Sequence, residues 1–216
     1  MTLRDARDLE HETEDEALPT SELLIKTVRD GATNEMSVGE LIDGLGDRAF
    51  ALIFLLLVLP TAVPGPPGLP VVFGIPLLFV TAQLWIGRER PWLPDALRRR
   101  RFSRPALLAM LERARPRLKR LEAVCRPRLE RLSDHRGERW IGAFFCFCTL
   151  FLVNPIPVPF SHLPLAIGLV VLALGLVERD GIVIIGGLIA SVVGIVINIS
   201  LVSSAVVLGT RLFHFM

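Results

Sequence analysis

The stretch LPTAVPGPPGLP, from Leu59 to Pro70, places five prolines inside a long apolar part of the chain. Each proline lacks a backbone N–H and clashes with the preceding helical turn, so a regular helix does not run through such a cluster. Apolar runs lie on both sides, from Ala49 to Leu59 and from Leu69 to Ile86. The stretch therefore predicts two helices joined by a proline-rich turn.

A second proline cluster follows 95 residues later, counted from Pro60 to Pro155, and it too lies between apolar runs. The pattern Leu-Pro-x-x-x-Gly recurs at 69–74 and at 163–168. These matches predict an internal repeat of helix, proline turn, helix and charged exit. A chance match between two short apolar helices is the competing interpretation.

Composition and charge indicate a membrane class. Hydrophobic residues make up 51% of the chain, and the mean hydropathy is +0.52. The run from Ile182 to Leu208 has no charged residue, and at about 1.5 Å per helical residue it is long enough to cross a hydrocarbon core of about 30 Å. Residues 1–48 carry 5 basic and 13 acidic residues, and residues 88–139 carry 17 and 7, so the net charges are −8 and +10.

The predicted fold is an all-α integral membrane protein with two repeated, proline-interrupted re-entrant hairpins and a C-terminal transmembrane helix. The run from Ala49 to Leu59 is too short to span the bilayer alone, which favours re-entry over the alternative of four full spans, or five if the last run is divided. The expected segments are an acidic disordered tail (1–18), short cytoplasmic helices (19–48), a first hairpin (49–87), a basic amphipathic cytoplasmic segment (88–139), a second hairpin (140–178) and a C-terminal transmembrane segment (179–216).

The basic segment sets the orientation, because Lys and Arg in short loops stay on the cytoplasmic side. We therefore predict a multi-pass membrane protein with a cytoplasmic N-terminus. Apolar residues recur every three or four positions among the arginines, which is typical of a helix in the headgroup layer of anionic lipids. Pro116 and Pro127 are each expected to start a short helix. Nucleic acid is not an expected partner, because no aromatics are interleaved. The membrane-surface residues are Arg115, Arg117, Lys119, Arg120, Arg126 and Arg128.

Two smaller signals lie before the first hairpin. Apolar residues between Leu23 and Val28 predict a short helix, and the spacing from Ser37 to Glu40 is that of a capping box that opens another. Neither segment carries recognisable chemistry.

The sequence has no recognisable catalytic motif, so we predict a protein that is not an enzyme and that has no catalytic residues, cofactor or metal site. Cys146 and Cys148 are interpreted as small apolar residues of a helix rather than as a redox or metal pair. The four histidines show no ligand spacing.

The candidate substrate or ion site combines the proline turns with nearby polar residues, because broken backbone and polar side chains at membrane depth are costly and tend to be functional. Asn198, in the last run, is a further polar residue at this depth. The candidate site residues are Pro64, Pro66, Pro67, Gln83, Asn154, Pro157, Pro159, His162, Glu178, Arg179 and Asp180.

The triplet Glu178-Arg179-Asp180 allows two interpretations. In the first it is an interfacial cap that ends one helix, with Asp180 capping the next. In the second one carboxylate is partly buried, is paired with Arg179, and exchanges a proton or a monovalent cation.

At these residues the chain resembles the exopolysaccharide synthesis ExoD family of bacterial inner-membrane proteins, over 21–209. The motifs are Leu59-Pro60 with its turn, Gly74-Ile75-Pro76-Leu77, Gln83 with Gly87-Arg88, Pro91-Trp92-Leu93-Pro94, the Arg-Pro-Arg segment, the turn at 154–164 and Gly175-Leu176-Val177-Glu178-Arg179-Asp180-Gly181. The resemblance implies a role in exopolysaccharide production, linked with alkali sensitivity, and supplies no catalytic residue.

Two functions are open. The first is an ion-coupled transporter or carrier whose site lies at the two hairpin tips, with a proton or monovalent cation as the coupled ion. The second is a non-transporting membrane organiser that binds exopolysaccharide assembly proteins through its basic face. Two hairpins are too few to enclose a site, so we expect a homo-oligomer in either case.

Overall fold

The computed structural model describes residues 19–29, 33–46, 48–66, 68–88, 90–124, 135–153 and 160–215. This part of the chain is mostly helical and divides into two compact units. Unit 1 combines 1–46 with 93–126, and unit 2 combines 47–92 with 127–216. The predicted tail at 1–18 lies outside the described residues. Two predicted segments that are far apart in sequence therefore belong to one unit.

Unit 1 contains α2 (Thr20–Arg29), α3 (Val38–Leu45), α6 (Asp95–Arg98) and α7 (Arg104–Val124), with strands β1 (Glu35–Ser37) and β2 (Arg101–Ser103). The two strands pair antiparallel, with Met36 opposite Phe102. The expectation of an all-α chain misses this sheet, because strands of three residues are too short for an alternating pattern to stand out.

The N-terminal cap that the spacing from Ser37 to Glu40 predicts is present at α3. The Ser37 hydroxyl accepts a hydrogen bond from the backbone N–H of Glu40 at 3.1 Å, at the first turn of α3. The helix ends at Gly46, whose φ of 52° lies in the left-handed region that favours glycine. The predicted helix around Leu23 is also present, as α2.

The prediction that Pro116 starts a separate helix is wrong, because α7 continues through it. Pro116 is exposed on this helix. A proline removes a single backbone donor from the helical ladder, and on an exposed face the carbonyl left without it can bond water. Pro127 lies outside the described residues.

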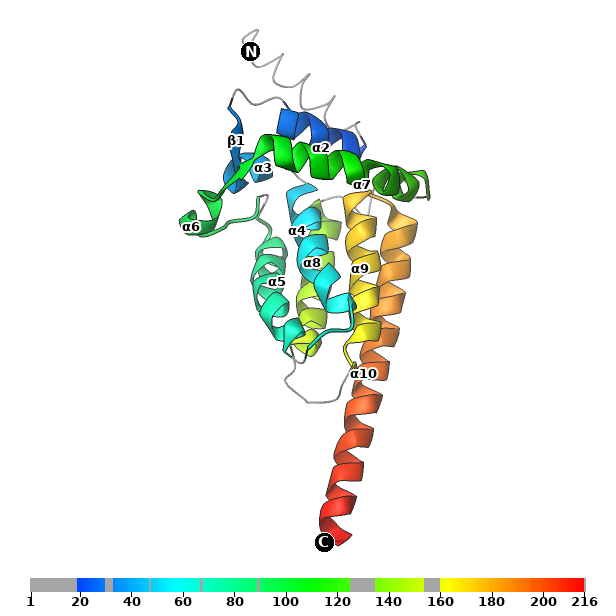
Figure 1. Cartoon of the computed structure of the whole chain (residues 1–216). Helices are drawn as coiled ribbons and strands as arrows, with labels where there is room; N and C mark the ends of the chain where they lie inside the picture. The colour runs from blue at the N-terminus through cyan, green and yellow to red at the C-terminus, as the bar shows by residue number, and fades with distance from the viewer. Residues whose placement is uncertain are drawn as a thin grey trace. The chain divides into compact units, whose positions relative to one another are not determined.

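Unit 2 is a bundle of α4 (Arg48–Val58), α5 (Leu69–Ile86), α8 (His135–Leu152), α9 (Leu163–Val177) and α10 (Gly181–Phe215), with a 3₁₀ turn, η1 (Leu59–Ala62), after α4. Helix α5 packs along α8, α4 packs along α9, and α10 packs along α9 (Figure 1). The rings of Phe54 and Phe145 stack with centroids 4.9 Å apart in the core of the bundle.

Helix α10 answers one question that the sequence left open. It is continuous from Gly181 to Phe215, through Gly186, Gly187 and Asn198, so the last apolar run is not divided. Helix α8 begins at His135, earlier than the apolar run at Ile141 suggests.

Small residues set the approach of α9 and α10. A Cβ on Gly168 would lie 2.6 Å from the Ser191 backbone nitrogen, and one on Gly187 would lie 2.5 Å from the Leu172 Cα. Close approach of helix backbones at small residues is typical of helix packing in membranes. The glycines at these positions therefore allow the two helix backbones to approach closely.

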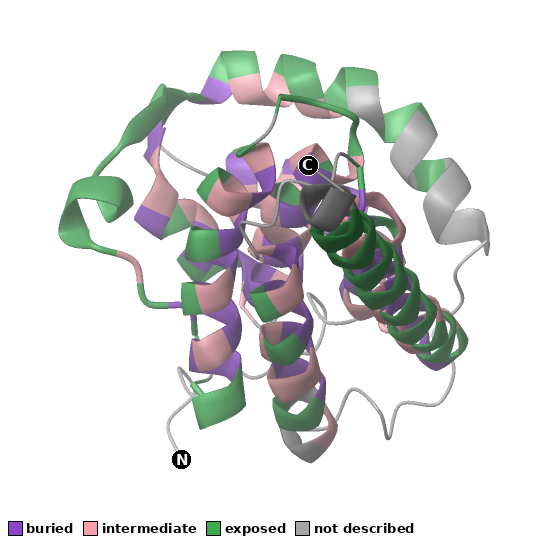
Figure 2. Ribbon diagram, turned by 90° about the horizontal axis from the view of Figure 1, so that it is seen from below, coloured by how far each residue is buried: buried purple, intermediate pink, exposed green. Residues whose placement is uncertain are grey.

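The outer surface of unit 2 is apolar. Among the described residues, all exposed large apolar side chains except Leu97, Phe102 and Met110 belong to unit 2. Leu56 and Ile86 are each 71% exposed, and exposed residues continue along α10 (Figure 2). On a soluble protein, an exposed apolar surface of this kind marks a site of contact with another protein or with a membrane. Two described helices, α5 and α10 over Gly181–Leu208, are long and apolar enough to cross a membrane.

Candidate functional site

The polar groups at one end of unit 2 form the first part of the candidate site. Asn198, eighteen residues into α10, is 4% exposed, and its Nδ2 donates to the Ser161 backbone carbonyl at 3.0 Å. The bond ties a continuous helix to the turn before α9. We call Ser161, His162 and Asn198 the tip cluster.

The backbone of this turn is unusual just before α9. Phe160 has a φ of 63°, a left-handed conformation that is uncommon for a bulky residue and marks a constrained turn. Ser161 is buried and His162 is half-buried, and α9 then starts at Leu163-Pro164, where a proline costs no helical hydrogen bond. The turn therefore directs polar backbone into the bundle.

The 3₁₀ turn η1 lies at the same end of the bundle, where α4 ends, and it packs against α9 (Figure 1). Thr61 in η1 is fully buried, and its hydroxyl donates to the Val58 carbonyl at 2.7 Å. Pro64 and Pro66 are exposed beyond it, and Gly68 has a φ of 99° before α5. Pro67, Asn154, Pro157 and Pro159, which the sequence places in the site, lie outside the described residues.

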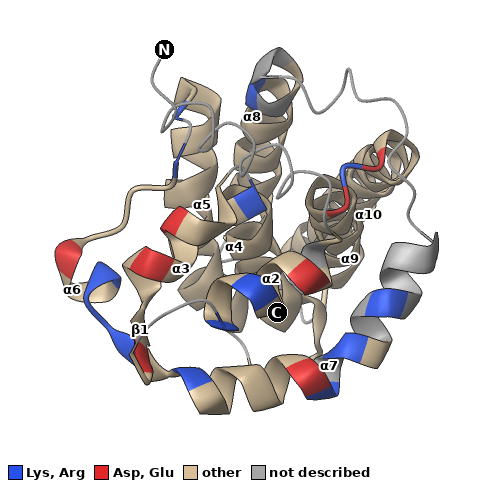
Figure 3. Cartoon of the chain, turned by 90° about the horizontal axis from the view of Figure 1, so that it is seen from above, with Lys and Arg blue, Asp and Glu red and all other residues tan. Residues whose placement is uncertain are grey.

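The described charged residues of unit 2 gather at the opposite end, except Arg211, which lies on α10 well past the tip cluster. Arg48 begins α4, Arg88 follows α5, and Arg139 lies in the first turns of α8. The Glu178-Arg179-Asp180 turn joins α9 to α10 at this end, as Figure 3 shows. The sequence has no Asp, Glu, Lys or Arg in 49–87, 140–177 or 181–210. Unit 2 therefore has a charged end and a tip end that is free of these residues.

Asp180 serves as the cap of α10. Its Oδ1 accepts hydrogen bonds from the backbone N–H groups of Ile182 at 2.9 Å and Val183 at 3.4 Å. Arg179 has a φ of 51°, and the Asp180 N–H returns to the Gly175 carbonyl at 2.9 Å. Asp180 therefore caps α10, as in the first interpretation of the sequence analysis, and its carboxylate also suits the positive end of the helix dipole.

Gln83 has a structural partner at the charged end. Its side-chain amide acts like a peptide group toward Trp92: Oε1 accepts from the Trp92 N–H at 2.6 Å, and Nε2 donates to the Trp92 carbonyl at 3.1 Å. The Trp92 ring also contacts Phe79 edge-on, with centroids 5.8 Å apart. Gln83 therefore fastens the segment after α5 to the helix.

The structure divides the candidate site. His162 lies in the tip cluster, whereas Glu178, Arg179 and Asp180 lie beyond the other end of α9, whose 15 residues span about 22 Å. Asn198 was not among the candidate site residues, but the structure places it beside the turn that holds His162. Its sequence signal was one amide in an apolar run, and its bond crosses 37 positions of the chain.

Two of the residues expected at a membrane surface make ion pairs within unit 1. Arg115 Nη2 and Lys119 Nζ each lie 3.8 Å from Glu22 Oε1, and both side chains are about half exposed. Arg117 and Arg120 lie in α7, whereas Arg126 and Arg128 lie outside the described residues.

An apolar-surfaced helical bundle with charges at one end and two helices long enough to cross a bilayer points to the class of membrane proteins. The comparisons with known proteins agree. The chain belongs to the ExoD family, described as exopolysaccharide synthesis, ExoD, whose sequence model matches residues 20–200. It is 28% identical to the protein ExoD of Rhizobium meliloti (strain 1021) over 185 residues, which cover 84% of this chain and 77% of that protein. No solved structure matches the chain significantly.

The family membership confirms the resemblance found from sequence motifs, and the structure gives one of them a physical meaning. In this chain the Gln83 side chain, from one of these motifs, binds the Trp92 backbone, from another. The family's name links it to exopolysaccharide synthesis. It is not known as a family of enzymes.

Proposed function

We propose that this ExoD-family protein is a multi-pass protein of the bacterial inner membrane with unit 2 embedded and its charged end at the cytoplasmic surface. Helix α9 is about 22 Å long, and α4 with η1 about 25 Å, so neither matches a hydrocarbon core of about 30 Å. Both hairpins then enter from the cytoplasmic side and turn back within the bilayer, as a repeated pair, and the N-terminus is cytoplasmic.

Helix α10 crosses the membrane in this arrangement. Its 28 apolar residues from Gly181 to Leu208 span about 42 Å, which exceeds the hydrocarbon thickness and requires tilt. Arg211 follows this segment and would reach the far interface.

We further propose that the protein acts as a carrier in exopolysaccharide production, with the tip cluster as its polar site. The observation that carries this proposal is the hydrogen bond from the buried Asn198 side chain to the Ser161 carbonyl, in the turn before α9 of a bundle with an apolar exterior. Broken helices and polar groups at membrane depth are the usual elements of transporter sites. His162 is the titratable group of the cluster, so a proton or monovalent cation is the coupled ion in this proposal.

A homo-oligomer completes the site in this proposal. The tip cluster lies on α10 and in the turn before α9, and exposed apolar residues continue along α10 past Asn198, at Ile199 and Leu201. A second copy would cover part of this surface and enclose the site.

The test is ion flux in proteoliposomes with a trapped pH dye, an imposed pH gradient, and sodium or potassium present or absent. We expect protein-dependent proton movement that Asn198→Ala abolishes, because the substitution removes the amide from the tip cluster. Ser200→Ala is the matched control, since its exposed hydroxyl bonds only one turn back on α10, to the Val196 carbonyl at 2.8 Å. Flux should persist in that variant.

Two outcomes would contradict the carrier. One is a flat trace from folded wild-type protein under every gradient, and the other is full flux in Asn198→Ala.

The re-entry of the two hairpins is tested separately, in a variant of the protein without native cysteines. A membrane-impermeant thiol reagent added from the periplasmic side should leave Gly65→Cys and Ser161→Cys unlabelled, and periplasmic labelling of both would favour full spans.

A membrane organiser of exopolysaccharide assembly is the second candidate. It is favoured by unit 1, a separate compact unit that carries the basic helix α7. Charge reversal at Arg117, Lys119 and Arg120 should then release co-purifying assembly proteins, whereas Asn198→Ala should leave them bound.

A further inference from the structure

Unit 1 contains a cavity of about 270 Å³ that is lined by residues of α2 and α7. Four lining residues lie on consecutive turns of α2, and the fifth comes from α7, which packs along it. The lining residues are Glu22, Ile25, Lys26, Arg29 and Arg115.

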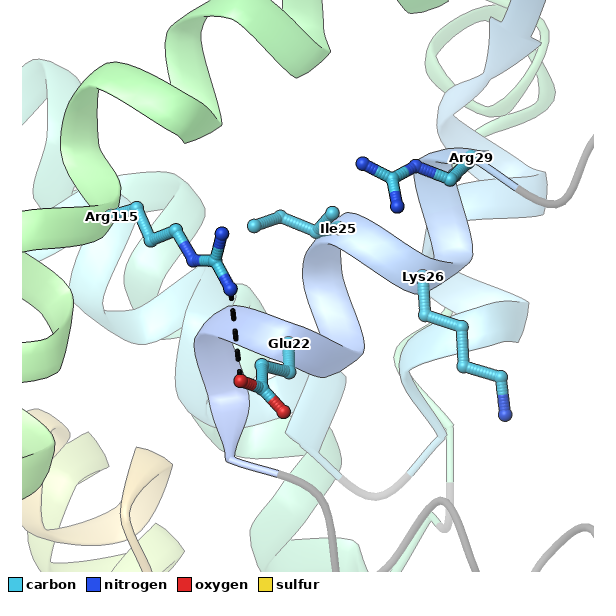
Figure 4. A pocket seen from close by; sticks show the side chains of 5 residues that line it. All are labelled: Glu22, Ile25, Lys26, Arg29 and Arg115. Carbon is cyan, nitrogen blue, oxygen red and sulfur yellow. Dashed lines mark ion pairs between the residues drawn. The ribbon is translucent and has the colours of Figure 1, made fainter.

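The charge of this cavity is positive. It has three cationic side chains and one carboxylate among its five lining residues, and Lys119 adds a further ammonium group 3.8 Å from the Glu22 carboxylate. In Figure 4 the Arg29 and Arg115 side chains extend toward the side of α2 that carries Ile25, and Lys26 extends the other way. Two guanidinium groups therefore face the same space.

The contact between Glu22 and Arg115 leaves hydrogen-bond donors of Arg115 available to another anion. Arg115 lies 3.8 Å from Glu22, and a charge-assisted hydrogen bond is shorter, at about 2.7–2.9 Å. The pair is thus an ion pair without a close hydrogen bond. Arginine presents donors in a planar fork that matches phosphate oxygens, so an incoming phosphate can take this position.

The remaining wall is apolar. Ile25 is 8% exposed and forms the part of the lining without charge. A free inorganic ion would gain little from such a wall, whereas the carbon-bearing side of an ester can pack against it. The lining therefore fits an anion with an organic group attached.

We propose that this cavity binds a phosphate or diphosphate ester, with Arg29 and Arg115 holding the phosphoryl oxygens and Ile25 contacting the organic part. The same chemistry is presented by a lipid phosphate headgroup and by a soluble sugar or nucleotide phosphate. The proposal does not rest on the carrier function, because all lining residues belong to unit 1.

The test is isothermal titration of the full-length protein in phosphatidylcholine nanodiscs with inorganic pyrophosphate and with glycerol 3-phosphate. We expect saturable binding that Arg29→Gln and Arg115→Gln each weaken by about tenfold, as the loss of a charged hydrogen bond does. Glu22→Gln should tighten binding, because it removes the competing carboxylate.

Matched controls come from α7 itself. Arg113→Gln and Glu112→Gln make the same charge changes at exposed positions outside the lining, and each should change the dissociation constant by less than about twofold. Thermal unfolding by circular dichroism shows which variants are folded. An absence of binding by folded wild-type protein overturns the proposal. Equal weakening by Arg113→Gln and Arg29→Gln also overturns it, because binding would then reflect overall charge.

Nanodiscs of different lipid content distinguish the two sources. If a lipid headgroup is the natural occupant, phosphatidic acid should compete with pyrophosphate more strongly than phosphatidylserine at the same mole fraction. If a soluble ester is the occupant, the two lipids should have equal effects, and binding by the Arg29→Gln variant should stay weak in both.

Discussion

The two units of this chain are held together by different interactions. In unit 1 arginine side chains link elements that are far apart in sequence: Arg98 pairs with Asp43 at 2.7 Å, and Arg104 binds the Val28 carbonyl at 2.8 Å. In unit 2 helix backbones approach closely at Gly168 and Gly187, and aromatic rings stack in the core. The apolar exterior belongs to unit 2.

This contrast is what physical chemistry predicts for the proposed arrangement, with unit 1 in water and unit 2 in the bilayer. In water, burial of apolar surface drives folding, and charged side chains can lie at the surface and still join elements. In lipid, the exterior is as apolar as the core, so association of helices depends on close packing and on the few polar groups inside. Substitutions in each unit should therefore change the free energy of unfolding by different amounts.

Removing the buried arginine of unit 1 should have the largest effect. Arg104 is 8% exposed, and its guanidinium also lies 3.3 Å from the Glu35 carbonyl and from the Glu40 carboxylate. We expect Arg104→Met to destabilise unit 1 by about 3 kcal/mol, because buried carbonyls lose their donor. Hydrogen exchange in nanodiscs should show faster exchange in α2 with unit 2 unchanged.

Arg98→Met is the control for this prediction. The Arg98–Asp43 pair is short, but its side chains are 51% and 43% exposed, so the loss should be about 0–1 kcal/mol. Equal losses in the two variants would show that burial does not decide the strength of these contacts.

Two adjacent glycines test the packing of unit 2. A Cβ on Gly187 would meet the Leu172 backbone, whereas a Cβ on Gly186 has open space. We expect Gly187→Ala to cost about 2 kcal/mol through overpacking, and Gly186→Ala to be neutral or to stabilise by up to about 1 kcal/mol through helix propensity. Thermal unfolding in detergent measures both. Similar melting temperatures would rule out the close α9–α10 contact.

The cap at Asp180 should contribute less. Asp180→Ala is expected to cost about 1 kcal/mol, because two N–H groups at the start of α10 lose their acceptor, and Asp180→Asn should cost only a few tenths. Unfolding and proteoliposome flux are measured on the same preparations. A loss of flux in a stable Asp180→Asn protein would restore the ion-exchange interpretation of this carboxylate.

The smallest effect is expected at Ser191. Its hydroxyl is fully buried at the α9–α10 contact and has no hydrogen-bond partner among the described residues. Ser191→Ala should raise stability slightly, by up to about 1 kcal/mol, since an unsatisfied buried hydroxyl is costly. Thr149→Ala is the comparison, because its buried hydroxyl donates to the Phe145 carbonyl at 2.8 Å and its removal should destabilise. A lower melting temperature for Ser191→Ala would show that the Ser191 hydroxyl contributes to the packing of unit 2.

Much of this fold was predictable from local pattern. Composition, spacing and proline chemistry predict the helices on either side of each proline cluster, the N-terminal cap at Ser37 and the apolar α10. The candidate site was less predictable. Gln83 and Asp180 were chosen because polar residues near membrane depth tend to be functional, and the structure gives both a local structural partner at the charged end.

The class of protein, the family, the helix–proline turn–helix order and the separation of charge from apolar runs can be read from the sequence, because they depend on residue type and short spacing. The pairing of β1 with β2, which joins 35–37 to 101–103, and the open cationic cavity lined by α2 and α7 come from the tertiary structure. It alone also placed Asn198 against Ser161. Such contacts join residues tens of positions apart, and their register depends on how whole helices pack, which local patterns do not encode.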